Sequence, residues 1–180
     1  MNSLVKTFSI VALFFLFSLL GFSQTSPSEP ARDPITITIT LIVDTENFDP
    51  CDLDNSCQFE VKRSDGVDVP IYSGEKLIDF LVEGIIDDEI IWQAKPKSAS
   101  IGKVNIKKID YNKGTRIFKK KDHSSVLSKR IKVKALYCTD GKPDYKYDLS
   151  FKIKKAGKAN GEYIIDPKIK IRPREAFKKN

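Results

Sequence analysis

The sequence contains few of the side chains from which transition-metal and redox sites are built. It has one histidine, His123, and its only methionine is Met1. A copper centre of the cupredoxin type needs two histidines, a cysteine and usually a methionine, so that class of protein is excluded. A zinc site would need Cys51, Cys57 and Cys138 together with His123, and no C-x-x-C pair is present. We therefore expect neither metal site, and no cofactor.

Motifs of the common enzyme classes are also missing. There is no G-x-G-x-x-G, no phosphate-binding loop and no G-x-S-x-G turn. Asp122, His123, Ser124 and Ser125 adjoin one another. A catalytic triad needs side chains that converge in space, whereas neighbours on a strand point to opposite faces. We expect that the protein is not an enzyme. A small periplasmic hydrolase with carboxylates from distant parts of the chain stays an alternative.

Only one apolar run is long, and it lies at the N-terminus. Lys6 precedes an apolar run over 10–22, and Gly21 and Ser23 lie at the −3 and −1 positions of a cut before Gln24. This order is typical of a secretory signal peptide. The run is shorter than the roughly 20 residues of a spanning helix. We expect residues 1–23 to be removed, and the protein to be periplasmic or secreted and not membrane-spanning.

The composition changes after the predicted cut. Residues 24–34 hold three prolines and almost no apolar side chains, which is typical of a flexible leader. Residues 35–173 are predicted to form one domain, and 174–180 a C-terminal tail. Basic residues outnumber acidic ones, 31 to 24, and the removed segment holds one lysine and no acid.

Apolar and polar residues alternate along most of the domain, as in 35–43, 130–137, 145–154 and 162–172. Successive side chains of a strand point to opposite faces, so this period predicts strands with one buried face. A sheet with one solvent-exposed face is typical of antiparallel pairing. We expect an all-β fold, an antiparallel β-sandwich of immunoglobulin-like or jelly-roll-like type, with eight or nine strands and at most one short helix near 75–83.

One strand changes its phase midway. Val104 and Ile106 occupy one phase, whereas Ile109 and Tyr111 occupy the other. An extra residue in one strand of a pair shifts the alternation by one position. The pattern predicts a β-bulge at 107–108.

Three short stretches of the domain are distinctive. They are ITLIVDTEN (39–47), DDEIIWQAKP (87–96) and YIIDPKIKI (163–171). They resemble the inclusion-body proteins related to AidA and PixA, a bacterial family whose first strand ends in a V-D-T-type stretch and whose last strand follows a D-P-x-I turn. The resemblance implies a β-sandwich with no known catalytic residues. The chain departs from that family in its signal peptide and in CDLDNSC (51–57).

Two cysteines bracket the stretch CDLDNSC. In an oxidising compartment paired thiols become disulfides. In the chain-entropy model a Cys51–Cys57 bridge contributes about 2.4 kcal/mol, and a bridge from either residue to Cys138 about 4.6 kcal/mol. Because proximity along the chain favours the short loop, we expect the Cys51–Cys57 disulfide. Cys138 is then either a half-buried small hydrophobe or the partner in an intermolecular disulfide.

The segment 44–56 is also rich in oxygen-bearing side chains. The calcium candidates are Asp44, Asp49, Asp52 and Asp54. Calcium takes six to eight oxygen ligands, but the spacing is not that of an EF-hand. Aspartates are common in turns because they bond their own backbone. A calcium-stabilised binding module therefore stays an alternative to a plain loop.

The outward phase of the last three predicted strands is basic. Its cations are Lys132, Lys134, Lys146, Lys152, Lys154, Lys168, Lys170 and Arg172. If these strands lie side by side, they form a positive plate for an anionic glycan or lipopolysaccharide. Nucleic acid fits less well, because the aromatic residues of these strands lie in the inward phase. The alternative is a solvated face whose lysines protect the sheet edges.

These observations favour an exported, non-catalytic β-sandwich that acts by binding or assembly, including assembly as a homo-oligomer. Contact with anionic envelope components through the basic face is the most specific form of this hypothesis.

Overall fold

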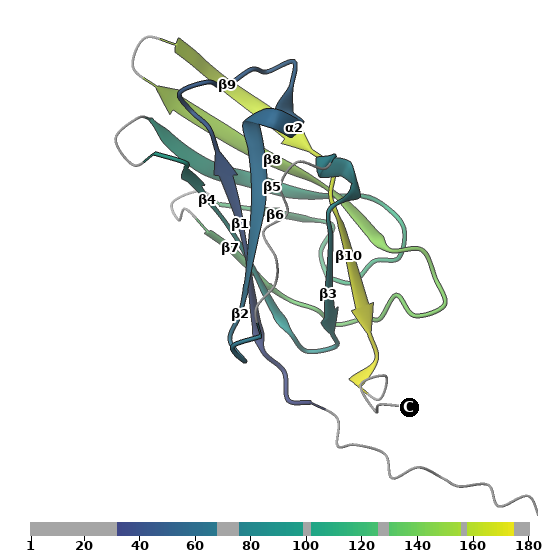
Figure 1. Ribbon diagram of the computed structural model, residues 1–180. Coiled ribbons are helices and arrows are strands. Elements are labelled where there is room, and N and C mark those ends of the chain that lie inside the picture. Colours follow the sequence, from purple (N-terminus) through teal and green to yellow (C-terminus); the bar gives the residue numbers. More distant parts are fainter. Residues whose placement is uncertain (1–31, 68–75, 99–101, 126–129, 156–157, 175–180) are drawn as a thin grey trace, which may run out of the picture. The chain divides into compact units, whose positions relative to one another are not determined.

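The computed structural model describes residues 32–67, 76–98, 102–125, 130–155 and 158–174 (Figure 1). The predicted signal peptide lies outside the described residues, as do most of the predicted leader and tail. All the described strands belong to one compact unit, Ala31–Phe177.

Ten strands and two single helical turns make up the described secondary structure. In chain order they are β1 (Thr36–Val43), α2 (Leu53–Ser56), β2 (Cys57–Arg63), η1 (Leu77–Asp79), β3 (Leu81–Ile85), β4 (Glu89–Pro96), β5 (Lys103–Lys113), β6 (Asp122–Ser124), β7 (Arg130–Lys134), β8 (Tyr145–Lys155), β9 (Lys158–Ile165) and β10 (Lys168–Arg172). The 3-10 turn η1 lies in the segment where a short helix was expected. The turn α2 was not predicted.

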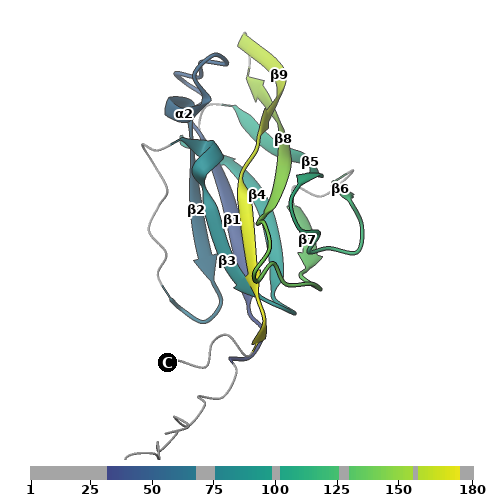
Figure 2. The same ribbon diagram turned by 90° about the vertical axis from the view of Figure 1, so that its right-hand side faces the viewer.

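The strands form two sheets. One has the order β2-β1-β4-β7, and the other has the order β3-β10-β8-β5-β6 with β9 paired to β8 (Figures 1 and 2). Buried side chains of both sheets form one hydrophobic core. The expected all-β sandwich is therefore confirmed, with ten strands in the described residues instead of eight or nine.

Each sheet contains one parallel pair, a feature that the sequence did not predict. β1 pairs with β4 in parallel, and β10 pairs with β3 in parallel, whereas the other pairs are antiparallel. Parallel neighbours need a long crossover connection. Between β1 and β4 this connection includes β2 and then β3 of the opposite sheet.

Alternation places the predicted inward side chains in the core. In β1 the side chains of Ile37, Ile39, Leu41 and Val43 are at most 1% exposed. The predicted β-bulge is present, because the β5–β8 register shifts between Ile106 and Lys108. The extra residue lets Ile106 and Ile109 both face inward, and both are buried.

A buried hydrogen bond joins the two sheets. Trp92 of β4 donates from Nε1 to the hydroxyl oxygen of Tyr147 of β8 over 3.0 Å. Both side chains are fully buried, and burial raises the pKa of Tyr147, so its hydroxyl stays neutral. Phe118 packs edge-on against Trp92, with ring centroids 5.8 Å apart.

Replacing Tyr147 with Phe should destabilise the fold, because it leaves the indole N–H of Trp92 buried without its partner. We expect the free energy of unfolding to fall by about 1–3 kcal/mol, measured from urea denaturation. Tyr137→Phe is the control: that side chain is 54% exposed, and its change should stay within about 0.5 kcal/mol. Equal effects at the two positions would contradict this role for the hydrogen bond.

Candidate functional site

The structure divides the predicted basic face between the two sheets. Lys132 and Lys134 lie on β7, at the edge of the four-stranded sheet, whereas the other six cations lie on β8 and β10 of the six-stranded sheet. A single basic plate would require β7, β8 and β10 to be neighbours in one sheet. This expectation is corrected: β7 pairs with β4, and only β8 and β10 pair with each other.

Carboxylates on neighbouring elements neutralise most of these cations. The pairs are Lys132 with Glu89 (2.8 Å), Lys134 with Asp87 (2.7 Å), Lys146 with Asp166 (2.5 Å), Lys168 with Asp79 (3.5 Å), and Lys170 and Arg172 with Glu83 (3.9 and 2.7 Å). Among the described residues, Lys152 and Lys154 have no ion pair. Surface pairs of this kind add little stability, but they remove the uniform positive field that a polyanion would need.

The four calcium candidates are engaged one by one with the backbone. Asp44, Asp49, Asp52 and Asp54 accept hydrogen bonds, in that order, from the N–H groups of Asn47, Cys51, Asn55 and Leu77. The bond from Asn47, followed by the ammonium of Lys97, lowers the pKa of Asp44. No group of three or more metal-binding side chains is present in the described part of the chain. The carboxylates therefore act as turn and helix caps.

The predicted Cys51–Cys57 disulfide is not formed in the structure. All three cysteines are free thiols, with Cys51 exposed and Cys57 buried. Cys57 begins β2 in the inward phase, opposite Val43 of β1. Burial, with a smaller contribution from the charge of Asp54, raises the pKa of Cys57 to about 12. Cys138 is half-buried and packs against the core, as a small hydrophobe does.

The residues Asp122, His123 and Ser124 form no catalytic triad. They make up β6, where His123 is half-buried and the two flanking residues are exposed. The ring of His123 packs edge-on against Phe118, and burial lowers its pKa. Because consecutive strand residues face opposite ways, Asp122 and Ser124 lie on the other face of β6 from the imidazole.

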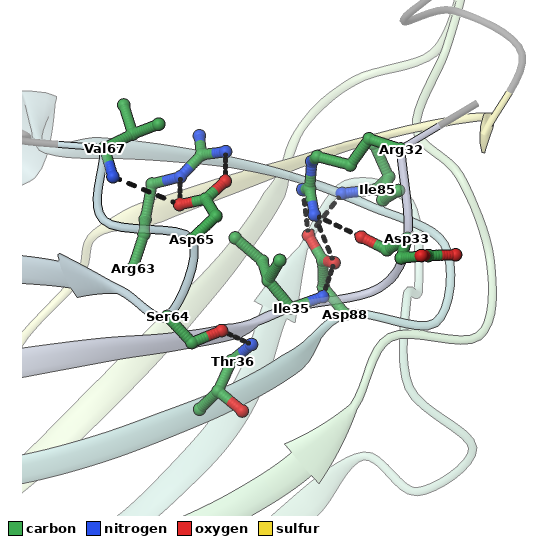
Figure 3. A network of polar contacts seen from close by, with 10 residues as sticks. All are labelled: Arg32, Asp33, Ile35, Thr36, Arg63, Ser64, Asp65, Val67, Ile85 and Asp88. Atoms are coloured by element: carbon green, nitrogen blue, oxygen red, sulfur yellow. Dashed lines mark hydrogen bonds and ion pairs between the residues drawn. The ribbon is translucent and has the colours of Figure 1, made fainter. Parts of the chain in front are cut away.

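A buried carboxylate that the sequence did not single out is the strongest polar feature of the fold. Asp88, in the turn before β4, has a fully buried side chain. Figure 3 shows its position beside Arg32, Ile35 and Ile85. Arg32 donates two hydrogen bonds to it, of 3.1 and 2.7 Å, and the N–H groups of Ile35 and Ile85 donate one each, both of 2.9 Å.

This arrangement is suited to structure and not to catalysis. A general base or nucleophile needs a free lone pair aimed at a substrate, whereas both oxygens of Asp88 already accept two donors. The same end of the sandwich holds a second bidentate pair, Arg63 with Asp65, whose carboxylate is 24% exposed (Figure 3). The network fixes the ends of strands.

A small hollow lies at the start of β2. It has a volume of about 30 Å³ and is bordered by Asp44, Ser56, Cys57, Lys97 and their neighbours. That volume is far below the several hundred Å³ of a ligand pocket. In the part of the chain that the structure describes, no helix has the length and apolar character needed to cross a membrane.

The fold has a counterpart among solved structures. It is similar to the crystal structure of the inclusion body protein PixA from Burkholderia cenocepacia. The chain shares the fold of this protein. The TM-score is 0.61 with 10% sequence identity, and the match covers 80% of this chain and 99% of the other. The resemblance noted in the sequence is thus confirmed at the level of fold.

Neither a protein-family model nor a curated protein matches the sequence.

Removing the guanidinium from the buried pair should be costly. Arg32→Ala leaves the carboxylate of Asp88 buried with backbone donors alone, and we expect a loss of about 3–5 kcal/mol in the free energy of unfolding. The matched control is Arg63→Ala, which breaks a bidentate pair with a partly exposed acid and should cost about 0–1 kcal/mol. Chemical denaturation of both variants compares them. Similar small losses would show that Arg32 does not anchor Asp88.

The thiols should differ sharply in reactivity. A pKa raised from 9.0 to about 12 lowers the thiolate fraction of Cys57 by about a thousandfold at a given pH below 9. In the folded protein we expect iodoacetamide to label Cys51 and to spare Cys57 until denaturant is added, as read by peptide mass spectrometry. Cys57→Ser identifies the slow site. Equal labelling of Cys51 and Cys57 under native conditions would refute this.

Proposed function

We propose that the protein is an exported, non-catalytic β-sandwich that acts by assembly or binding. The observation that carries the proposal is the similarity of fold to an inclusion body protein, across nearly the whole of that chain. An organised assembly needs a rigid unit with defined surfaces. It does not need a reaction centre.

The polar groups of the described residues support a role without catalysis. Both oxygens of the buried carboxylate of Asp88 already accept hydrogen bonds, and the imidazole of His123 is separated from the neighbouring Asp122 and Ser124. Small enzymes group titratable side chains around a cleft. The hydrolase alternative thus gains no support from these groups.

Two of the sheet edges, β6 and β7, favour contact through side-chain surfaces over extension of a sheet from copy to copy. The edge strand β6 has three residues and β7 has five, and β7 carries Arg130, Lys132 and Lys134. Short edges and charged side chains disfavour uncontrolled strand pairing. Because the ion pairs neutralise much of the predicted basic face, we place assembly ahead of glycan or lipopolysaccharide binding.

Self-association is the direct test of this proposal. We expect the chain from Gln24 to Asn180 to show concentration-dependent larger species in sedimentation velocity, with weaker association as salt screens the polar contacts. A single monomeric species at every concentration and salt level would remove assembly from the proposal.

Export is tested separately. Expression of the whole sequence in a Gram-negative host, followed by fractionation, should yield a periplasmic or secreted form whose mass begins at Gln24. An intact N-terminus on protein recovered from the cytoplasm would contradict this part of the proposal. Lys6→Glu should slow processing, because the positive region of the signal is lost, whereas Lys113→Gln should leave it unchanged.

A further inference from the structure

The last residue of β5 and the connection to β6 concentrate positive charge. The segment 113–121 has no acidic residue, and its cations are Lys113, Arg116, Lys119, Lys120 and Lys121. All five are exposed, and none forms an ion pair within the described residues. This contrasts with the sheet faces, where most lysines have a carboxylate partner.

The loop is held firmly in spite of its exposed cations. Ile117 and Phe118 are buried in the core, and Phe118 packs against Tyr145 with ring centroids 5.1 Å apart. The hydroxyl of Tyr111 donates to the carbonyl oxygen of Gly114 over 2.7 Å. At Gly114, where φ is +88°, a Cβ would lie 1.8 Å from the carbonyl oxygen of Asp144. A fixed loop presents its charges with little ordering cost on binding.

The backbone of two exposed apolar residues is hydrogen-bonded to the backbone of this loop. The N–H groups of Leu136 and Tyr137 both donate to the carbonyl oxygen of Ile117 (2.8 and 3.3 Å). Leu136 is 37% exposed and Tyr137 is 54% exposed. We name 113–121 together with 136–144 the cationic end.

The cationic end keeps a clear positive excess after its acids are counted. The segment 136–144 adds Lys142, Asp140 and Asp144, so the two segments hold six cations and two carboxylates, and the exposed Asp122 follows Lys121 directly. Asp144 belongs to the turn against which the loop packs, since the N–H of Thr115 donates to the carbonyl oxygen of Pro143 over 3.1 Å.

We propose that the cationic end docks on the surface of an anionic lipid bilayer. Each Lys or Arg near such a surface contributes about 1 kcal/mol. Tyrosine is favoured at the membrane–water interface, where its ring is apolar and its hydroxyl stays wet. A soluble polyanion would use the charges and gain nothing from Leu136 and Tyr137. Single-stranded nucleic acid is bound by several stacking aromatics, and the exposed aromatic here is Tyr137 alone among the described residues of the cationic end.

This surface is separate from the assembly proposed above and does not depend on it. The lipid contact uses one end of the sandwich and can be made by a single copy. Sedimentation velocity in the absence of vesicles reports on assembly, and vesicle binding reports on docking, so either can fail alone.

Vesicle co-sedimentation tests the docking surface. The chain from Gln24 should bind vesicles of phosphatidylcholine mixed with phosphatidylglycerol at low salt, should bind pure phosphatidylcholine weakly, and should dissociate as the Debye length falls to about 10 Å near 0.1 M salt. Lys119→Gln, Lys120→Gln and Lys121→Gln combined should weaken binding about a hundredfold, from three contributions of about 1 kcal/mol. Absence of binding to the mixed vesicles would overturn the proposal.

A matched variant tests whether vesicle binding depends on the position of the lysines or on the net charge of the protein. Lys103→Gln, Lys152→Gln and Lys154→Gln combined also remove three charges, but Lys103 and Lys154 pair at the end of β5 remote from the loop. This variant should bind vesicles almost as well as the parent. An equal loss in both triple variants would show a response to net charge and contradict the assigned surface. Unchanged melting temperatures confirm that both variants fold.

Tyr137→Ser distinguishes a bilayer from a soluble polyanion. It should weaken vesicle binding several-fold and leave binding to soluble polyphosphate unchanged. Only a bilayer has an interface at which the ring of Tyr137 adds to the binding energy. If Tyr137→Ser leaves vesicle binding unchanged, charge alone mediates contact and the bilayer assignment is wrong.

Discussion

The buried carboxylate of Asp88 is the constraint on which one whole end of the sandwich depends. Its oxygens hold the N–H of Ile35, just before β1, and the N–H of Ile85, the last residue of β3. Because β1 and β3 belong to different sheets, one side chain fixes their separation. Burying an anion costs several kcal/mol unless donors replace its water, and Arg32 supplies two of these donors. Gly84 provides the space for this carboxylate, since a Cβ there would lie 3.1 Å from Asp88 Oδ2.

The alternation of apolar residues was sufficient to predict the layered fold, because period two is a local property of each strand. It placed Trp92 and Tyr147 inward, and the phase change in 103–111 located the β-bulge. The parallel pairing of β1 with β4 was beyond this signal. A strand with one buried face has the same pattern whichever way its neighbour runs, so partner and direction depend on the packing of the whole chain.

The candidate site was harder to predict, because charge is a property of neighbours in space. Lys132 and Lys134 were assigned correctly to an outward phase, but Glu89 and Asp87, which neutralise them, lie far away in the sequence. The phase of Cys57, shared with Phe59 and Val61, was a readable sign that this thiol faces the core. Asp88 gave no such sign, because an acidic residue after Asp87 in a turn is usually solvated. The loop at 113–121 stands out only once the ion pairs elsewhere are known.

The parallel neighbour of β1 also determines when this protein can fold. The register joins Thr36 to Glu89 and Val43 to Pro96, so the partner of the first strand follows it by 53 residues. β2 can pair early, as a local hairpin does, but one flank of β1 stays open until β4 has been synthesised. Contacts of such long sequence separation slow folding. A chain that leaves the ribosome or a translocation channel from its N-terminus therefore carries a strand with one unpaired edge until β4 emerges.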